Sequence, residues 1–443
     1  MISASTQKDK RIALFGLGGS GMVTAHALKA GGAMVYCYDD NPDRVKQAKD
    51  EGLNTADLHD VDFATLDALV LAPGVPLTHP IPHWTVDLAN AARVPIIGDI
   101  ELFRLERNAK AGKSDFIAIT GTNGKSTTTA LIAHVFACAG YNVQLGGNIG
   151  TAVLSLQMDE LDDDENNIVY IVECSSYQID LAPSLNPSIG LLLNLAPDHL
   201  DRHGSMAHYA SVKARLVTNS DYAVVGVDDA YSDAISKAAN ASTQVLRVSN
   251  SKELTSGISS VDGDLVKYED SQASVLFTLA NAPALRGIHN AQNAAAAWAV
   301  CEKAGLSAEQ IANGFQSFPG LAHRMEQLGT LDDVLFVNDS KGTNADASAM
   351  ALGSFDDIYW IAGGLAKAGG IEELRPYFKN IKKAYLIGEA APDFAVSLGE
   401  DVPFEISNTL DVAVEHAAHD AKKDMQKGAS KEAVVLLSPA CAS

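Results

Sequence analysis

A strand, a glycine turn and a helix between residues 116 and 139 limit the possible folds most strongly. The β-branched run Ile117 to Thr120 predicts a buried strand, a turn follows through Gly121 to Gly124, and an apolar helix is expected from Ala130 to Ala139. Glycines adopt backbone conformations that a Cβ atom would forbid. Successive N–H groups can then face an anion at the positive end of the following helix. The pattern predicts a phosphate-binding loop in an α/β fold.

The residues that follow the turn favour a nucleoside triphosphate as the ligand. Lys125 can reach the β- and γ-phosphates, and the hydroxyl of Ser126 or Thr127 can bind the accompanying Mg²⁺. Gly121 precedes Gly124 by three positions, whereas the common loop has five. The alternative is an ordinary turn with a surface lysine. We expect ATP or GTP to bind here.

A second glycine turn lies near the N-terminus. A strand beginning at Arg11 leads into Gly16-x-Gly18-x-x-Gly21, followed by a helix from Met22 to about Ala30 and a strand that ends at Asp39-Asp40. This order is typical of the first βαβ unit of a Rossmann-like fold, which binds a diphosphate. A dinucleotide cofactor of a dehydrogenase fits the pattern, and so does the diphosphate of a UDP-sugar.

Acidic and histidine side chains follow two later predicted strands. Glu173 comes directly after the strand Ile168 to Val172, and Asp198 and His199 follow the strand predicted at 189–195. In parallel α/β sheets, ligands gather at the carboxyl ends of strands. We therefore expect a metal or phosphate site at these positions.

Length and patterning predict an α/β protein of three domains. The 443 residues are enough for two to four domains with buried cores. A polar stretch between Arg104 and Ser114 is interpreted as a linker, and alternating strands and helices resume after Gly320. The predicted domains are a Rossmann-like domain at 1–110, a central P-loop ATPase-like domain with a parallel sheet at 111–318, and a C-terminal Rossmann-like domain at 319–443.

Charge and cysteine usage exclude several classes of partner. The net charge of −22 argues against broad nucleic-acid binding and against adhesion to anionic membranes. The five cysteines show no metal-binding spacing, and their odd number fits a reducing cytosol without disulfides. No apolar run approaches the length that spans a bilayer. We expect a cytoplasmic monomer that does not insert into membranes.

Several motifs together resemble the Mur ligases, the ATP-dependent amino-acid ligases of peptidoglycan synthesis. The resemblance spans essentially the whole chain and rests on five stretches: Gly121-Thr-Asn-Gly-Lys-Ser-Thr127, Asp198-His199, His289-Asn290, His323-Arg324 and Asn338-Asp-Ser-Lys341. The stretches 338–344 and 436–443 are similar to those of the member that adds D-glutamate to UDP-N-acetylmuramoyl-L-alanine. The resemblance implies phosphorylation of the muramoyl-L-alanine carboxylate by ATP, giving an acyl phosphate that the amine of D-glutamate then attacks.

The resemblance also implies roles for individual residues. It makes Lys125, Glu173, His199 and Lys213 the catalytic residues, and two Mg²⁺ ions are held by Ser126, Glu173, His199 and a carbamylated Lys213. Without it, Lys213 would be interpreted as a surface lysine on the helix 206–217. The implied ATP-binding residues are Gly121, Thr122, Asn123, Gly124, Lys125, Ser126, Thr127, Asn293, Arg324 and Asp339. The implied UDP-sugar residues are Gly18, Gly19, Ser20, Gly21, Asp39, Asp40 and Asn148, and those for D-glutamate are Thr343, Lys367 and Ser443.

Two features depart from the family pattern. Asn41 stands where some members carry a basic residue beside the uracil. The chain ends at Ser443, where relatives continue with an aromatic-bearing loop and a final helix, so the C-terminal domain is expected to be truncated and to bind D-glutamate weakly.

Three other functions remain open at this stage. A ligase of the same architecture with another acceptor, such as a folylpolyglutamate synthase, would share the phosphate loop. A nicotinamide-dependent dehydrogenase accounts for the N-terminal glycine turn, Gly16 to Gly21, but not for the phosphate loop at 121–127 or the stretch 338–344. A non-catalytic nucleotide sensor does not account for the acidic and histidine residues at the strand ends.

Overall fold

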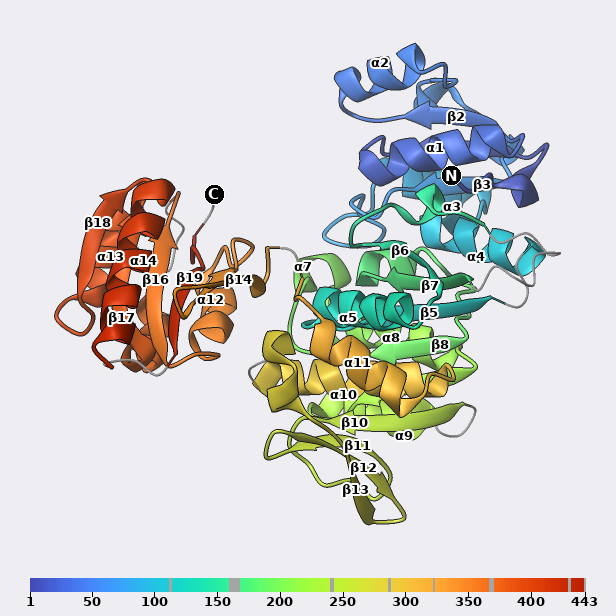
Figure 1. Ribbon diagram of the computed structural model, residues 1–443. Coiled ribbons are helices and arrows are strands. Elements are labelled where there is room, and N and C mark those ends of the chain that lie inside the picture. Colours follow the sequence, from blue (N-terminus) through green and yellow to red (C-terminus); the bar gives the residue numbers. More distant parts are fainter. Residues whose placement is uncertain are drawn as a thin grey trace. The chain divides into compact units, whose positions relative to one another are not determined.

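The computed structural model describes residues 1–110, 114–158, 168–239, 243–285, 288–321, 323–365, 370–428 and 432–441. Within these ranges the strands form three sheets, and helices alternate with strands along most of the chain (Figure 1). One compact unit comprises residues 1–277 and 292–315, and a second comprises 278–291 and 316–443. The expected α/β class is confirmed.

The first sheet is parallel and has the order β2-β1-β3-β4. Because the chain passes from β1 to one neighbour and then to the other, the strand order reverses at β1, where ligands bind in such sheets. The elements of this part are β1 (Arg11–Phe15), α1 (Gly19–Ala30), β2 (Met34–Tyr38), α2 (Pro42–Asp50), β3 (Ala68–Leu71), α3 (Trp84–Ala92), β4 (Ile96–Ile97) and α4 (Asp99–Lys110).

Helix α1 begins at Gly19, three residues before the predicted start at Met22. Glycine is needed inside its first turn, because a Cβ atom on Gly21 would lie 1.8 Å from the backbone oxygen of Gly16. Gly16 itself has a φ of +98°, a conformation that L-residues rarely adopt. These two glycines therefore allow a backbone approach in the turn that a residue with a Cβ atom would prevent.

The linker predicted between Arg104 and Ser114 is wrong for residues 104–110. These residues complete α4, whose inner face includes the buried Ile100 and Phe103. Glu106 is also buried, because its carboxylate accepts hydrogen bonds from the Ser5 hydroxyl at 2.8 Å and the Thr6 N–H at 2.5 Å. Residues 104–110 are polar in sequence, but they form a helix that packs against the N-terminal segment.

The second sheet has the order β13-β12-β11-β10-β9-β8-β5-β7-β6. Pairing is parallel from β11 to β6 and antiparallel between β11 and β12. Residues 257–278 thus form a three-stranded addition to this sheet. The strands are β5 (Asp115–Thr120), β6 (Asn142–Gly147), β7 (Ile168–Glu173), β8 (Ile189–Leu192), β9 (Tyr222–Gly226), β10 (Gln244–Ser249), β11 (Gly257–Val261), β12 (Asp264–Glu269) and β13 (Gln272–Thr278).

Strand β5 lies between β7 and β8, so the end that leads into the phosphate loop is flanked by the ends of both neighbours. The helices of this region are α5 (Lys125–Cys138), α6 (Ser176–Asp180), α7 (Leu200–His203), α8 (Met206–Thr218), α9 (Ala230–Ala239), α10 (Ile288–Lys303) and α11 (Ala308–Ser317). Asn293 lies inside helix α10.

The third sheet lies in the second unit and has the order β14-β15-β19-β16-β17-β18. Only the β14–β15 pair is antiparallel among the strands described there. Its elements are β14 (Glu326–Leu331), β15 (Val334–Asn338), α12 (Ala345–Leu352), β16 (Asp357–Gly363), β17 (Ile381–Ile387), α13 (Ala391–Leu398), β18 (Phe404–Asn408), α14 (Leu410–Gln426) and β19 (Ala433–Leu437). The predicted Rossmann-like alternation is confirmed.

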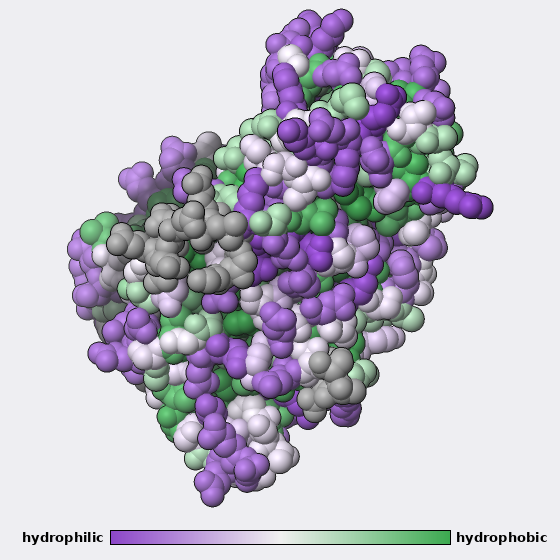
Figure 2. Space-filling view, turned by 90° about the vertical axis from the view of Figure 1, so that its right-hand side faces the viewer, coloured by the Kyte–Doolittle hydropathy of each residue, from purple (hydrophilic) through white to green (hydrophobic). Residues whose placement is uncertain are grey.

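Two simple expectations can be compared with this structure. Within the described ranges, which include all five cysteines, no disulfide is formed. In the part of the chain that the structure describes, no helix has both the length and the apolar character needed to cross a bilayer. On the face shown in Figure 2, hydrophobic residues are interspersed with hydrophilic ones.

Candidate active site

The turn between β5 and α5 has the geometry of an anion-binding loop. Gly121 and Gly124 have φ values of +154° and +83°. A Cβ atom on Gly124 would lie 2.2 Å from Oδ1 of Asn293, so glycine is required where helix α10 packs on the loop. Helix α5 begins at Lys125 rather than at the predicted Ala130, and Ser126 and Thr127 therefore lie in its first turn. Backbone N–H groups at this helix start have no intrahelical partner and suit phosphate oxygens.

Asn194, at the end of the neighbouring strand β8, holds the loop in place. Its backbone oxygen accepts from Thr122 N–H at 2.8 Å, and its Oδ1 accepts from Asn123 N–H at 2.9 Å. Its Nδ2 donates to the backbone oxygen of Asn123 at 3.2 Å and to Oε1 of Gln292 at 2.9 Å. Sequence reasoning missed both Asn194 and Gln292. The signal was the position of Asn194 after an apolar strand next to β5.

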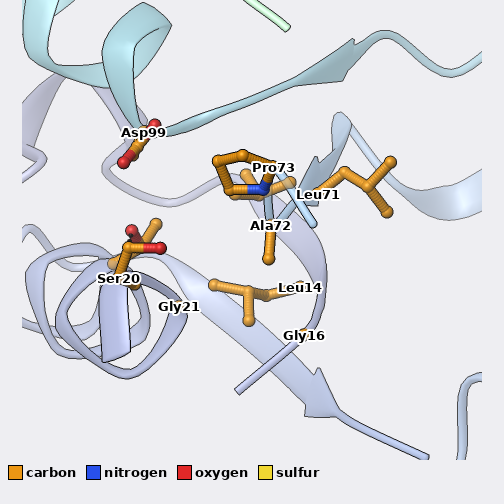
Figure 3. A pocket seen from close by; sticks show the side chains of 10 residues that line it. Leu14, Gly16, Ser20, Gly21, Leu71, Ala72, Pro73 and Asp99 are labelled. Atoms are coloured by element: carbon orange, nitrogen blue, oxygen red, sulfur yellow. Dashed lines mark hydrogen bonds between the residues drawn. The ribbon is translucent and has the colours of Figure 1, made fainter. Parts of the chain in front are cut away.

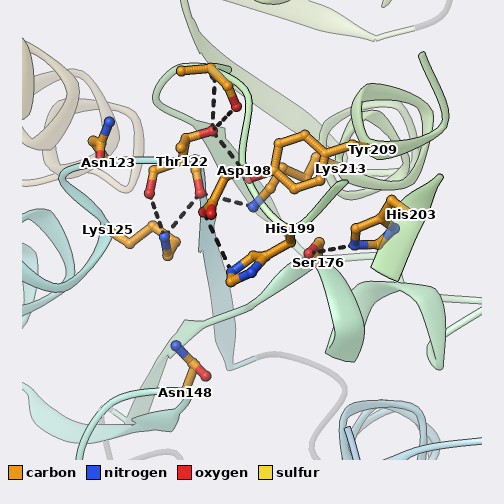
Figure 4. Close-up of polar contacts among 12 residues, drawn as sticks. Thr122, Asn123, Lys125, Asn148, Ser176, Asp198, His199, His203, Tyr209 and Lys213 are labelled. Carbon is orange, nitrogen blue, oxygen red and sulfur yellow. Dashed lines mark hydrogen bonds and ion pairs between the residues drawn. The ribbon is translucent and has the colours of Figure 1, made fainter. Parts of the chain in front are cut away.

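Two lysines converge on the backbone oxygen of Gly121. Lys125 Nζ donates to it at 3.0 Å and to Thr122 O at 2.8 Å. Lys213 Nζ donates to the same Gly121 oxygen at 2.8 Å and to Thr120 Oγ1 at 2.9 Å. Figure 4 shows both side chains beside Asp198 and His199. The structure therefore places Lys213, which would otherwise be interpreted as a surface residue, directly behind the phosphate loop.

The environment of Lys213 favours its neutral amine. The side chain is only 1% exposed. Burial, and then the charge of Lys125, lower the pKa of Lys213 to about 7, although Asp198, Cys174 and Glu173 act in the opposite direction. Tyr209, which sequence reasoning also missed, lies beside it, with its ring centre 5.1 Å from Lys213 Nζ and its hydroxyl 3.1 Å from Thr122 Oγ1. A neutral lysine amine is a nucleophile that can react with CO₂.

Glu173 at the end of β7 has an unused carboxylate oxygen. Its Oε1 accepts from Asn148 Nδ2 at 2.8 Å, while the buried Oε2 has no hydrogen-bond partner among the residues that the structure describes. Mg²⁺ takes oxygen ligands and usually binds through one or two carboxylates together with substrate phosphates. The donor types of Glu173 and Ser126 fit such an ion. Among the described residues, no cluster of three or more His, Cys, Asp and Glu side chains forms a metal cage.

His199 occupies a strained position between the strand end and helix α7. It has a φ of +53°, and its Nε2 lies 3.4 Å from Oδ2 of Asp198. Its ring centre is 5.0 Å from that of Tyr177 on α6. A non-glycine residue held in the left-handed region is typical of functional sites. His199 and Asp198 are both partly exposed, so a ligand can reach them.

Five of the seven residues predicted for a UDP-sugar line one cleft of about 520 Å³. Gly18, Ser20, Asp39 and Asp40 contribute from the first sheet, and Asn148 contributes from the loop after β6. Asp39 is buried, and its carboxylate accepts hydrogen bonds from the Leu17 and Asn41 N–H groups at 2.6 and 2.8 Å. Gly19 and Gly21 lie in the first turn of α1, beside this cleft.

Arg44 is a residue of this cleft that sequence reasoning missed. It extends from α2, and its Nη1 lies 3.4 Å from Oδ2 of Asp39 and 3.9 Å from where a Cβ of Gly18 would stand. The guanidinium thus lies over the glycine turn, where a diphosphate would bind. Arg44 supplies the positive charge that Asn41, three residues earlier, does not. Asn41 instead caps α2 by accepting from Asp43 N–H.

A small enclosed pocket of about 10 Å³ lies beneath the same turn (Figure 3). Its lining includes Gly16, Ser20, Gly21 and the buried Asp99 at the start of α4. Within the described ranges Asp99 Oδ2 has no hydrogen-bond partner, and burial raises the pKa of this carboxyl group. The pocket has room for about one water molecule, which would satisfy this oxygen.

The remaining predicted residues belong to the second unit. Arg324 is exposed, and Asp339 at the end of β15 is buried. Burial raises the pKa of Asp339 to about 6, although its carboxylate accepts hydrogen bonds from Ser438 Oγ at 2.8 Å and Met325 N–H at 3.2 Å. Thr343 lies in the loop before α12. Lys367 and Ser443, predicted for D-glutamate, lie outside the described residues.

Comparison with known proteins was made against sequences and solved structures. Residues 119–301 match the Mur ligase middle domain family. The UDP-N-acetylmuramoylalanine--D-glutamate ligase of Agrobacterium fabrum is 59% identical over 444 residues, covering 100% of this chain and 93% of that protein. The protein of the same name from Brucella abortus is 57% identical over 445 residues, with 100% and 93% covered.

Solved structures of similar fold are more distant in sequence. A UDP-N-acetylmuramoyl-L-alanyl-D-glutamate--2,6-diaminopimelate ligase shares 19% identity with a TM-score of 0.58, covering 99% of this chain and 88% of that one. The UDP-N-acetylmuramate-alanine ligase of Thermotoga maritima shares 17% with a TM-score of 0.54, covering 98% and 96%. These two structures support the fold, and the sequence relatives establish the family. On the combined evidence of the family match and of full-length similarity to these relatives, the chain belongs to the Mur ligase family, among its UDP-N-acetylmuramoylalanine--D-glutamate ligases.

Proposed function

We propose that this chain is an ATP-dependent ligase that joins D-glutamate to UDP-N-acetylmuramoyl-L-alanine in the synthesis of cytoplasmic peptidoglycan precursors. The observation that carries the proposal is the side chain of Asn148. It lines the sugar cleft and donates at 2.8 Å to Glu173, whose strand β7 adjoins β5 and the phosphate loop. A substrate in the cleft thus lies near groups suited to ATP and its metal.

The reaction has two steps. A carboxylate oxygen of the L-alanine residue attacks the γ-phosphorus of ATP, and ADP leaves, giving an acyl phosphate. The amine of D-glutamate then attacks the carbonyl carbon, phosphate leaves, and the amine loses its proton as the amide forms. A carboxylate is a poor electrophile, so phosphorylation provides the leaving group that amide formation needs. Catalysis rests mainly on positioning and on neutralising negative charge.

The residues of the first unit have separate roles in this scheme. The loop from Gly121 to Thr127 holds the ATP phosphates with its N–H groups, and Lys125 neutralises charge on the transferred group. Ser126, Glu173, His199 and Lys213 are proposed to hold two Mg²⁺ ions, which when bound neutralise phosphate charge. Reaction of neutral Lys213 with CO₂ gives a carbamate and a proton, and this turns an amine into an oxygen ligand.

We propose a matching division of the chain. Residues 1–110 bind the UDP-sugar, residues 111–318 bind ATP with Asn293 packed on the loop, and residues 319–443 bind D-glutamate. In the last region Arg324 and Asp339 are proposed to contact ATP. Thr343, Lys367 and Ser443 are proposed to contact D-glutamate. Ligands shared by several domains commonly require domain closure before reaction.

The proposal is tested by ADP release with UDP-N-acetylmuramoyl-L-alanine and a panel of amino acids. Turnover that depends on D-glutamate is the expected result. Turnover with glutamate on a folate acceptor would favour a folylpolyglutamate synthase instead. Hydride transfer to a nicotinamide without ATP use would favour a dehydrogenase.

Replacement of Arg44 by alanine is expected to weaken UDP-sugar binding about tenfold, because it removes the cation that lies over the glycine turn. The effect is limited because half of this side chain is exposed to solvent. Calorimetric titration with UDP-N-acetylmuramoyl-L-alanine measures it. Lys46→Ala, an exposed residue on the same helix that does not line the cleft, is the matched control. Equal affinities of the two variants would show that Arg44 does not contact the diphosphate.

A further inference from the structure

The short helix α7 connects the predicted metal ligand His199 to the wall of the sugar cleft. Arg202 in this helix donates from Nη1 to the backbone oxygen of Gly74 at 3.0 Å. Gly74 belongs to the turn after β3 and lines the cleft. The same guanidinium lies over the ring of Tyr177, with its central carbon 4.6 Å from the ring centre. Arg202 therefore contacts both the wall of the cleft at Gly74 and the ring of Tyr177.

Tyr177 completes the connection to His199. Its ring centre is 5.0 Å from that of His199, and its ring stacks on His203 at 5.6 Å with an interplanar angle of 14°. His203 is buried and shares a hydrogen bond of 2.8 Å with Ser176, the first residue of α6. The guanidinium of Arg202 and the rings of His199 and His203 thus all pack around the ring of Tyr177.

A second contact keeps α7 close to the loop after Gly74. Gly204, which ends α7, has a φ of +72°, and a Cβ atom there would lie 2.5 Å from Nε2 of His79. The hydroxyl of Thr78 lies 3.5 Å from the backbone oxygen of Arg202. Residues 74–79 and 202–204 therefore lie against each other at the surface of the protein.

We propose that Arg202 is a positioning residue that couples occupancy of the sugar cleft to the placement of His199. The inference rests on the proposed function, in which His199 serves the metal-bound nucleotide. A UDP-sugar that contacts the turn at Gly74 fixes the acceptor of the Arg202 hydrogen bond. Arg202 in turn fixes Tyr177 and the start of α7, where His199 is held at positive φ. Sugar and metal-nucleotide sites then bind cooperatively, and by linkage the effect is reciprocal.

Calorimetry measures this coupling directly. The dissociation constant of UDP-N-acetylmuramoyl-L-alanine is determined with and without saturating Mg²⁺ and a non-hydrolysable ATP analogue, and the ratio of the two constants is the coupling factor. We expect a factor of about ten in the native protein, within the usual range for coupled sites. In Arg202→Ala the factor should fall close to one.

Further variants separate positioning from simple stability. Arg202→Lys keeps a donor for Gly74 but presents no planar group to Tyr177, so an intermediate factor is expected. Tyr177→Leu removes the ring against which Arg202 and His199 pack, and should also lower the coupling factor. Arg104→Ala is the matched control, because Arg104 donates to Asn186 at 2.9 Å, away from the cleft. Its factor should equal that of the native protein.

The outcomes distinguish this inference from the proposed function. A native protein that binds the UDP-sugar and turns over D-glutamate, but shows a coupling factor of one, overturns the role of Arg202. The same holds if Arg202→Ala and Tyr177→Leu keep the native factor, or if Arg104→Ala loses it equally. A native protein that neither binds the UDP-sugar nor releases ADP would instead contradict the proposed function.

Discussion

Replacement of Lys125 by alanine is expected to abolish measurable ADP formation. Lys125 starts α5 and is the cation of the phosphate loop, with its Nζ held at 2.8 and 3.0 Å by two loop oxygens. No other cation of this kind emerges from residues 121–127. Removing a preorganised charge from a site of developing negative charge typically costs a factor of about 10² to 10³ in kcat. Because Lys125 also helps to bind ATP, the loss in kcat/KM should be larger still.

The affinity for UDP-N-acetylmuramoyl-L-alanine tests whether this loss is specific. Lys125 does not line the sugar cleft, so titration of Lys125→Ala should give a dissociation constant close to the native one. Lys237→Ala provides a control for lysine removal, since Lys237 is exposed on α9 and pairs with Asp233 at 2.7 Å. Native turnover in Lys125→Ala would remove this residue from its proposed role.

The strands and both glycine turns could be predicted from the sequence because their signals are local. β-branched runs, glycines at positive φ and an acidic residue after a strand each lie within a few residues. The predicted helix starts lie a few residues too far toward the C-terminus, for a related reason. Ser126 to Thr129 are weak helix formers, and only the left-handed Gly124 shows that α5 begins before them. The helix at 104–110 was missed because its buried face includes Glu106, whose partners lie about 100 residues earlier.

The missed site residues depend on contacts between distant parts of the chain. Asn194 meets the phosphate loop only because β8 pairs with β5, and one sequence does not contain that register. Arg44 reaches the glycine turn from a helix, three residues after the expected basic position. The burial of Lys213 depends on how α8 packs on the sheet, with its amine against Thr120 and Gly121. The family resemblance supplied its role, and the structure supplies a physical reason why its amine is reactive.

Replacement of Lys213 by methionine is expected to separate activity from stability. Methionine has a similar length but no amine, so neither a carbamate nor another metal ligand can form at this position. Turnover should fall by at least about 10²-fold, as for the loss of other preorganised electrostatic groups. Folding should not suffer at neutral pH, because the native protein pays to bury an ammonium group there and the variant does not. Thermal unfolding measured beside ADP release tests both parts.

The pH dependence of the free energy of unfolding shows whether the buried Lys213 amine stabilises or destabilises the fold. Burial lowers the pKa of Lys213 to about 7, whereas an unfolded lysine has a pKa of about 10.4. Between these values the unfolded chain binds more protons than the folded one, so this group makes stability rise with pH by up to about 1.4 kcal/mol per unit. Below the folded pKa its cost is fully present, and above the unfolded pKa the cost is absent. In buffer free of CO₂, the native protein should therefore gain stability relative to Lys213→Met as pH rises from about 7 to about 10.

The carbamate itself can be observed without an activity assay. Carbon-13-labelled bicarbonate should give a new carbonyl resonance in the native protein, stronger above pH 7, where the amine is neutral, and no resonance in Lys213→Met. Lys237→Met is the control for exposed lysines, whose amines are largely protonated at this pH. If Lys213→Met retained native turnover, or if the resonance persisted in it, Lys213 would have a purely structural role behind the loop. Loss of both with an intact fold would support the conclusion that burial at Gly121 prepares this lysine for reaction with CO₂.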